Sequence, residues 1–303
     1  MTKIILDTDI SPDYDDVGAM AVLHALAKRG EAEILATATC NAFPYALTSI
    51  RIINAFCGRD DIPTGVVRPD GLSIDDVMHN RRWPVFLFEK YGKPDYLKAE
   101  PAVRLYRRLL AAADDASVTF VTIGWLTNLA DLLASGPDEF SPLDGPALVA
   151  RKVAKLVSMA GKFPEGREFN VFKDAQASIK VFHEWPTPIL FSGFEIGVNI
   201  LTGKKLIAHP GEDNPVKDAY AIALSQGDPD GRSSWDHTTV LAAVRGPADY
   251  FDVERGRIQI NDDGSNGWEA DPVGPHTRLL PKMSWSELAD VIEDLMADYS
   301  SAL

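Results

Sequence analysis

The sequence predicts an α/β protein in which a Rossmann-like, mostly parallel central sheet is flanked by helices, with residues 1–303 in a single domain. Two observations lead to this fold class. Short apolar, β-branched segments alternate along the chain with segments of helical period, as in successive βαβ units. Within the apolar segments there is no alternation with polar residues, which is typical of parallel strands covered by helices on both faces. The last third departs from this order, and we expect it to be largely helical.

The individual elements follow from the same two periodicities. We predict strands at Lys3–Leu6, Glu33–Thr39, Ile62–Val67, Val118–Ile123, Ala154–Met159 and Pro188–Phe191. We predict helices at Asp15–Arg29, Tyr45–Phe56, Ala102–Ala113, Leu126–Leu133, Asp174–His183, Pro215–Leu224 and Thr238–Val244. Near the end of the chain we expect a hairpin around Arg255-Gly256, from Tyr250–Glu254 to Arg257–Ile260, and an amphipathic helix over Ser284–Tyr299 capped by Ser284 or Ser286. The longest stretch without clear period is Gly71–Pro101, which is typical of a lid or an irregular excursion.

The composition restricts the partners of the protein. Its 44 Asp and Glu outnumber its 30 Lys and Arg, so the formal net charge is −14, which argues against nucleic acid and anionic membranes. Cys40 and Cys57 lack the spacing of metal ligands, and we expect both to be buried and free. The first residues lack the apolar region of a signal peptide, and no run approaches the roughly 20 apolar residues of a membrane span. We therefore expect a cytoplasmic protein.

Carboxylates concentrate where the first predicted strand ends. The segment Asp7-Thr8-Asp9-Ile10-Ser11-Pro12-Asp13-Tyr14-Asp15-Asp16 places five of them within ten residues. In parallel sheets, ligands bind beyond the carboxyl ends of the strands. One or two of these aspartates would suffice to cap the next helix, but five together repel one another unless protons or a cation offset their charge. Irregular cages of oxygen ligands suit Ca²⁺ better than Mg²⁺, so the segment predicts a calcium site.

The same segment permits a second interpretation. Asp7-Thr8-Asp9 after a hydrophobic strand also resembles the signature of the haloacid dehalogenase-like phosphatases. In that class the first aspartate is the nucleophile and the metal is Mg²⁺. The class does not require a second pair of acids such as Asp15-Asp16, which favours the first interpretation.

Four segments together resemble the inosine–uridine-preferring nucleoside hydrolases. They match the family's aspartate signature, its Gly-Pro-Leu-Thr-Asn turn, its Glu-Phe-Asn motif with a following aspartate, and its last metal aspartate before a helix. In this chain they read Asp7-Thr8-Asp9…Asp15-Asp16, Gly124-Trp125-Leu126-Thr127-Asn128, Glu168-Phe169-Asn170 with Asp174, and Trp235-Asp236. They occur in the family's order and span most of the chain. The resemblance implies a nucleoside hydrolase-like fold, a homodimer or homotetramer, and Ca²⁺-dependent hydrolysis of an N-glycosidic bond.

The resemblance also assigns the metal site. Asp9, Asp16 and Asp236 would bind Ca²⁺ together with the main-chain carbonyl of Ile123, and Asp7 would orient the loop. Asp9 would in addition take a proton from the metal-bound water. Breaking a nucleoside N-glycosidic bond passes through an oxocarbenium-like state, so a site that fixes the attacking water and surrounds the sugar with carboxylates suits this chemistry.

The substrate contacts follow in the same way. The resemblance implies that Asp15 and Asn170 hold ribose hydroxyls, that Glu168 lies at the 5′ side of the sugar, and that Asn41 lies near the sugar. Trp83 could form a stacking wall opposite the leaving base, although one aromatic residue in an irregular loop is more often packing.

The leaving group is where this chain departs most from the family. Trp235 occupies the position at which many members have a histidine that protonates the departing base. Purine-preferring members have tryptophan there, whose stacking raises the basicity of the base, so we expect a preference for purines. His79 and His237 are candidate acids, but each is more typical of a surface or structural histidine.

Three further departures concern the loops. Five residues separate Asp9 from Asp15, more than in the commonest members, and the extra acid Asp13 is expected to be solvated. Trp125 replaces the usual proline, and no asparagine precedes Glu168 at the expected distance.

We therefore predict Ca²⁺-dependent hydrolysis of a ribonucleoside, preferably of a purine, to free base and ribose. Alternatives are a haloacid dehalogenase-like Mg²⁺-dependent phosphatase, a family member acting on another ribosylated small molecule, and a Ca²⁺-dependent sugar-binding protein without turnover.

Overall fold

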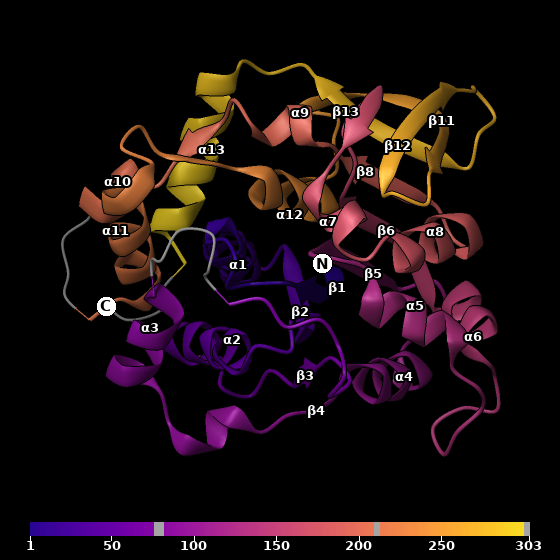
Figure 1. Ribbon diagram of the computed structural model, residues 1–303, viewed down its shortest axis with the longest axis horizontal. Helices are drawn as coiled ribbons and strands as arrows, with labels where there is room; N and C mark the ends of the chain where they lie inside the picture. Colours follow the sequence, from indigo (N-terminus) through magenta and orange to yellow (C-terminus); the bar gives the residue numbers. More distant parts are fainter. Residues whose placement is uncertain (76–81, 209–212, 300–303) are drawn as a thin grey trace.

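The architecture is a long mixed sheet with helices on both faces, seen in a computed structural model that describes residues 1–75, 82–208 and 213–299 (Figure 1). The main sheet has eleven strands in the order β4-β3-β2-β1-β5-β6-β8-β13-β11-β12-β7. Pairing is parallel from β4 through to β13 and antiparallel among β13, β11, β12 and β7. The predicted fold class, a mostly parallel sheet flanked by helices, is thus confirmed.

The strands are mostly short and apolar. Their bounds are β1 Thr2–Thr8, β2 Ala32–Thr39, β3 Thr64–Val66, β4 Glu100–Pro101, β5 Val118–Ile123, β6 Val153–Met159, β7 Glu165–Arg167, β8 Ile189–Ser192, β9 Leu201–Thr202, β10 Arg232–Ser233, β11 Phe251–Ile260, β12 Ser265–Ala270 and β13 His276–Pro281. The strands β9 and β10 form a separate antiparallel pair.

The helices lie between the strands and cover them. Their bounds are α1 Asp15–Lys28, α2 Pro44–Phe56, α3 Trp83–Tyr91, α4 Ala102–Ala112, α5 Thr127–Ala134, α6 Gly145–Lys152, α7 Phe169–Lys173, α8 Ala175–Glu184, α9 Phe194–Gly197, α10 Lys204–Ala208, α11 Pro215–Gly227, α12 Trp235–Arg245 and α13 Trp285–Ala297, with a 3-10 turn at Pro94–Leu97. No helix within the described ranges is long and apolar enough to cross a membrane.

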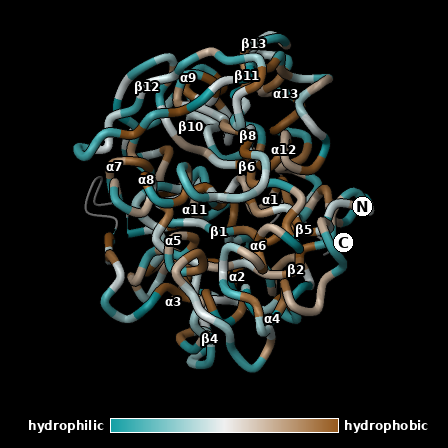
Figure 2. Tube along the Cα trace, turned by 90° about the vertical axis from the view of Figure 1, so that its right-hand side faces the viewer, coloured by the Kyte–Doolittle hydropathy of each residue, from teal (hydrophilic) through white to brown (hydrophobic). Residues whose placement is uncertain are grey.

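The apolar core is divided by the sheet into two layers. One buried cluster joins the sheet to α1, α2, α11, α12 and α13, and the other joins it to α4, α5, α6 and α8. In Figure 2 the hydrophobic stretches gather around the central strands, and hydrophilic stretches run along the outer loops. Burial on both faces explains why the central strands read as unbroken apolar runs.

The parallel register brings several strand ends to one edge. Thr8 at the end of β1 lies beside Thr39 at the end of β2 and beside Ile123 at the end of β5. Met159 ends β6 one strand further along the sheet. The loops that follow these strands therefore meet at the same place, as expected for a ligand site in a parallel sheet.

Two predicted features near the end of the chain are wrong. The hairpin around Arg255-Gly256 is one continuous strand, β11, and the chain turns after Ile260 instead. Gly256 pairs with Ala270 on one side and His276 on the other. A Cβ there would lie 2.5 Å from the Trp268 ring, so this glycine serves close packing rather than a turn. The last third is also not largely helical, because β11, β12 and β13 extend the sheet.

The stretch Gly71–Pro101 is more regular than the sequence indicated. It contains the helix α3, a 3-10 turn and the short strand β4. Elsewhere the sequence indications agree with the structure. Ser284 caps α13 in a capping box with Glu287, and both Cys40 and Cys57 are buried and free.

A buried arginine holds the loop after α5 against α4. Arg107 on α4 is 2% exposed and pairs with Asp138 at 2.6 Å. It also donates to the Ser135 hydroxyl and to the carbonyls of Ser141 and Leu143. Removal of the guanidinium would take the cation from Asp138, which would keep the N–H groups of Phe140 and Ser141 as donors, and would take one donor from each of the other acceptors.

We expect Arg107→Met to lower the free energy of unfolding by roughly 3 kcal/mol, since breaking a buried ion pair strands the partner. The matched control is Arg104→Met on the same helix, where the arginine is half exposed and pairs with Glu139. That control should leave the urea midpoint nearly unchanged. Equal shifts of the two midpoints would show that the Arg107 network contributes little.

Candidate active site

A cavity of about 320 Å³ opens at the strand ends. It lies beyond β1, β5 and β6 and is bounded by the starts of α1 and α12. The residues that line it are Asp9, Pro12, Asp13, Asp15, Asp16, Ile123, Met159, Arg167, Glu168, Phe169, Asn170, Phe172, Phe194, Arg232, Trp235 and Asp236. Eight of the residues that the sequence predicted for metal, catalysis or substrate are in this set.

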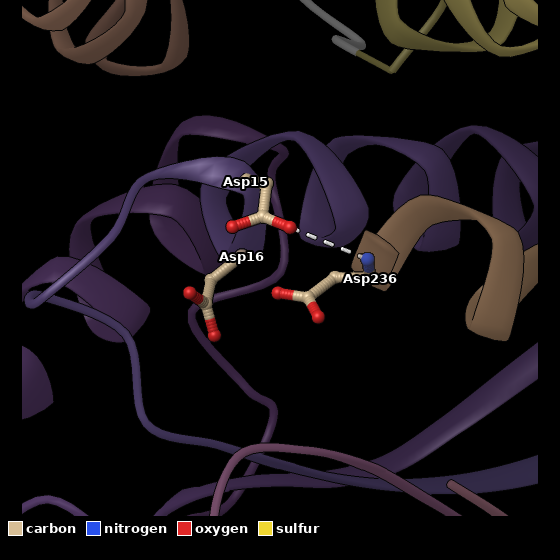
Figure 3. Close-up of side chains that lie close together, drawn as sticks. All are labelled: Asp15, Asp16 and Asp236. Carbon is tan, nitrogen blue, oxygen red and sulfur yellow. Dashed lines mark hydrogen bonds between the residues drawn. The ribbon is translucent and has the colours of Figure 1, made fainter. Parts of the chain in front are cut away.

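Three carboxylates converge at the bottom of the cavity (Figure 3). Asp15, Asp16 and Asp236 each offer an oxygen, and these oxygens lie within 4.8 Å of one another. Asp15 and Asp16 are in the first turn of α1, and Asp236 is in the first turn of α12. The backbone N–H of Asp236 donates to Asp15 at 3.4 Å. Helix N-termini favour negative charge, so both helices help to hold the acids together.

Burial makes this arrangement costly for ionised acids. Asp9, Asp15, Asp16 and Asp236 are at most 6% exposed. Desolvation raises the pKa of each well above the usual range, and repulsion from neighbouring carboxylates raises it further. The Thr8 hydroxyl donates to Asp16 and offsets only part of this. A divalent cation with oxygen ligands would offset the repulsion directly, and this donor set suits a hard cation.

Asp9 is fixed by close contacts between strand ends. A Cβ on Gly124, which follows β5, would lie 2.5 Å from the Asp9 nitrogen, so only glycine fits there. The side chain of Asn41 donates to the Asp9 carbonyl at 3.2 Å and to Ile74 at 2.7 Å. Its amide oxygen accepts from the N–H groups of Phe43 and Ile74. Asn41 is thus bonded to backbone groups and is not among the residues that line the cavity, and its place near the sugar stays a prediction.

Asp7 supports the site from behind. It is 1% exposed and accepts hydrogen bonds from the Tyr106 hydroxyl and, at 2.9 Å, from Asn128. Asn128 also donates to the carbonyl of Thr39, which connects β1, β2 and α5. Desolvation raises the pKa of Asp7 to about 7. Trp125, where the family usually has proline, donates to the Cys40 carbonyl at 2.9 Å and so binds the end of β2.

The Glu168-Phe169-Asn170 motif forms the opposite wall. Glu168 caps α7 and accepts from the backbone N–H groups of Gly161, Asn170 and Val171. Its burial raises the pKa to about 7 even though these three donors favour the ionised form. The side chain of Asn170 donates to the Met159 carbonyl at 3.1 Å.

Aromatic rings complete the walls. Trp235 is half-buried, lines the cavity and donates from its indole N–H to the carbonyl of Phe194 at 2.8 Å. Its ring lies 5.3 Å from that of Phe194 at an angle of 31°. Trp83, the expected second stacking wall, is 0% exposed and packs in the apolar core instead. It does not line the cavity, so we assign it no contact with substrate.

The sequence did not reveal the partner of Asp13. Arg232, just before α12, forms an ion pair with Asp13 and lies 3.6 Å from Asp228. Its guanidinium also lies 5.0 Å from the centre of the Trp235 ring. The expectation that Asp13 is solvated is therefore wrong. Asp13, in the longer loop between Asp9 and Asp15, pairs with an arginine that is distant in the chain. No local sequence pattern predicts a pair between residues so far apart.

The one candidate acid that the structure describes, His237, does not line the cavity. His237 is 0% exposed, and its Nε2 lies 3.0 Å from the Tyr220 hydroxyl. Desolvation lowers its pKa to about 3, so it is neutral near pH 7 and cannot serve as an acid there. His79 lies outside the described residues.

Comparison with known proteins identifies the family. A model of the inosine-uridine preferring nucleoside hydrolases matches residues 4–273. The chain belongs to this family. The pyrimidine-specific ribonucleoside hydrolase RihA of Shewanella woodyi is 32% identical over 206 residues, 65% of this chain and 61% of that protein. The non-specific ribonucleoside hydrolase RihC of Klebsiella pneumoniae is 28% identical over 229 residues, 68% of this chain and 64% of that protein. The chain thus spans less than two thirds of the length of these relatives.

The solved structures agree on the fold. An inosine-guanosine nucleoside hydrolase superposes over 100% of both chains with a TM-score of 0.75 at 17% identity. The likeness of fold extends from the first strands to α13.

The raised pKa values predict how stability depends on pH and metal. Asp7 and Glu168 have pKa values of about 7 in the folded protein, above the roughly 4 of the unfolded chain. Their favourable contribution is full below about pH 4 and is lost as the pH rises through about 7. The four carboxylates of Asp9, Asp15, Asp16 and Asp236 shift in the same direction.

We therefore expect the Tm of chelator-treated protein to fall between pH 5 and pH 8, and added Ca²⁺ to raise the Tm more at pH 8 than at pH 5. Thermal unfolding in both conditions measures this. An equal increase at the two pH values would mean that a cation does not relieve the buried acids.

Proposed function

We propose that this nucleoside hydrolase is a Ca²⁺-dependent enzyme that hydrolyses the N-glycosidic bond of a ribonucleoside, with a preference for purines. The observation that carries the proposal is the cavity itself, in which buried carboxylates lie at the bottom of aromatic walls. Hydrolysis through an oxocarbenium-like state needs negative charge around the sugar and an oriented water. The relatives named above act on ribonucleosides, which supports the same substrate class here.

We refer to the four buried aspartates Asp9, Asp15, Asp16 and Asp236 as the floor of the cavity. Each of them, and the wall that carries Glu168, has a role in this proposal. Asp9, Asp16, Asp236 and the carbonyl of Ile123 would hold the Ca²⁺, which when bound orients the water and makes it more acidic. Asp9 would accept the proton of that water as it attacks C1′. Asp15 and Asn170 would bind ribose hydroxyls, and Glu168 would bind the 5′ side of the sugar.

The leaving base would stack on Trp235. No described histidine lines the cavity, so the histidine acid of many family members has no counterpart among these side chains. A ring stacked on the base stabilises it as it gains electrons, and this effect is larger in the transition state than in the ground state. Purines offer the larger stacking surface, which is why we propose a purine preference.

The structure bears differently on the alternative functions, because it disfavours a phosphatase but is compatible with a sugar-binding protein. A phosphatase of the haloacid dehalogenase class would need Asp7 as nucleophile, but Asp7 is buried behind the cavity and bonded to Tyr106 and Asn128. A sugar-binding protein without turnover would share the whole site, and activity alone separates it from an enzyme. Cytoplasmic location and a homodimer or homotetramer remain predictions, the latter testable by light scattering.

Asp9→Asn should lower kcat on inosine on the order of 10²–10⁴-fold, because the amide cannot accept a proton from the water. The measurement is release of reducing sugar with Ca²⁺ and with chelator. Asp60→Asn, an exposed acid that precedes β3 and so lies at the edge of the sheet opposite to the cavity, is the control for the change of charge. Activity of Asp9→Asn within a few-fold of wild type would remove Asp9 as the base.

Trp235→Ala should slow a purine nucleoside far more than p-nitrophenyl riboside, whose leaving group needs no activation. Stacking contributes about 0.5–1.5 kcal/mol beyond burial, so we expect a loss of roughly tenfold on the purine and a larger one if stacking strengthens in the transition state. Trp235→Phe keeps an aromatic ring and should retain most of the activity. Equal losses on both substrates would mean that Trp235 instead supports Asp236.

A further inference from the structure

Three basic side chains stand over the aromatic rings on the Glu168 side of the cavity. Arg167, at the end of β7, lies with its guanidinium 4.3 Å from the centre of the Phe172 ring. The Lys173 ammonium lies 4.7 Å from the ring of Phe169 and 5.6 Å from that of Phe172. On the adjacent wall, the Lys162 ammonium lies 5.3 Å from the ring of Phe194. We refer to Lys162, Arg167 and Lys173 as the basic rim.

The basic rim carries charge that the described acids neutralise only in part. In a chain of net charge −14, none of these three side chains forms an ion pair with a described residue. Among the described residues, the one hydrogen bond from these three side chains is donated by Nε of Arg167 to the carbonyl of Asp263 at 3.1 Å. Two acids interact with the rim without forming an ion pair with it: Arg167 helps to lower the pKa of Asp263, and Lys162 offsets part of the rise that burial causes in the pKa of Glu195. The carboxylate of Asp263 accepts from Ser265, and that of Asp174 accepts from Thr127 and Ala177.

The rim and the floor form separate layers. The floor acids are at most 6% exposed, whereas Lys162 and Arg167 are exposed to solvent. The cations of the rim therefore do not neutralise the buried acids of the floor. They face the part of a substrate that extends out of the cavity. Arg167 itself lines the cavity and directly precedes Glu168 in the chain.

We propose that the substrate is an N-riboside with a phosphate on its 5′ position, and that the basic rim binds this phosphate. The inference rests on the proposed function, in which Glu168 lies at the 5′ side of the sugar. A phosphate carries up to two negative charges and several acceptor oxygens, which match one guanidinium and two ammonium groups. An anion on the base would lie instead near Trp235, where the cation beside the indole ring, Arg232, is already paired with Asp13.

The reaction is the same hydrolysis on a charged substrate. The oxygen of water bonds to C1′, the C1′–N bond breaks and its electron pair leaves with the base. One proton of the water goes first to Asp9 and ends on the base. The phosphate ester stays intact, so the products are free base and ribose 5-phosphate.

The first test compares inosine with inosine 5′-monophosphate on the Ca²⁺-loaded enzyme. We expect kcat/KM to be about ten- to a hundredfold higher for the monophosphate, as charge-assisted hydrogen bonds provide. This advantage should shrink when NaCl is raised from about 0.05 M to about 0.5 M, while kcat/KM for inosine stays constant. Inorganic phosphate should inhibit turnover of the monophosphate competitively, which distinguishes a phosphate subsite from a preference for the whole nucleotide.

The second test removes one charge at a time. Arg167→Gln and Lys173→Gln should each lower kcat/KM for the monophosphate about tenfold and change that for inosine less than twofold. The control is Arg257→Gln, an exposed arginine that lines a different pocket and should change neither value. If inosine is hydrolysed at least as well as its monophosphate, or if Arg167→Gln lowers both alike, the inference is overturned while the proposed function stands. If neither compound nor an aryl riboside is hydrolysed, both are overturned.

Discussion

The repulsion among buried carboxylates is the constraint on which the rest of the structure depends. Asp15, Asp16 and Asp236 place oxygens within 4.8 Å of one another in surroundings that raise the pKa of each. An isolated cluster of this kind would hold protons or spread apart. Here two helix N-termini point at it, and the contact between α1 and α12 keeps the two acidic turns in place. The acids are therefore held close at a cost in stability, which is reasonable only if a cation or a reaction uses them.

The supporting residues around this cluster act on the backbone rather than on a ligand. Gly124 permits the close approach of two strand ends, and Asn41 fixes the Asp9 carbonyl. Asn128 joins Asp7 to the end of β2. Each contact connects different strands, so the positions of the acids depend on the parallel register of the whole central sheet. This explains why the family motifs are spread along the chain although the site is compact.

How far the sequence predicted this site depends on how far apart the interacting residues lie. The acids at the floor follow an apolar strand or begin a helix, so local pattern and family resemblance were enough to place them in one site. Trp83 and Asp13 were misjudged because their environments are set by distant segments. Arg232 and Asp13 are 219 residues apart in the sequence, and the residues that flank each of them give no indication of the ion pair. The strand β11 was split for a similar reason, since the space for a Cβ at Gly256 is closed by Trp268 of the neighbouring strand.

Acidic and basic residues lie at different depths in the cavity, with the acids buried and the basic rim exposed. The two groups therefore have different physical roles. The buried acids act at short range in a poorly hydrated site, where electrostatic interactions are strong and little affected by salt. The basic rim is exposed, so its interactions are screened and contribute less energy per contact. Between them, the aromatic rings exclude water and hold the cations in place from one side. Under the proposed function, bond cleavage would depend on the buried acids, whereas the choice among substrates that all carry a ribosyl group would depend on the walls and the rim. Residues of the rim can therefore change between relatives without disturbing the acids, because the two layers share no hydrogen bond among the described side chains.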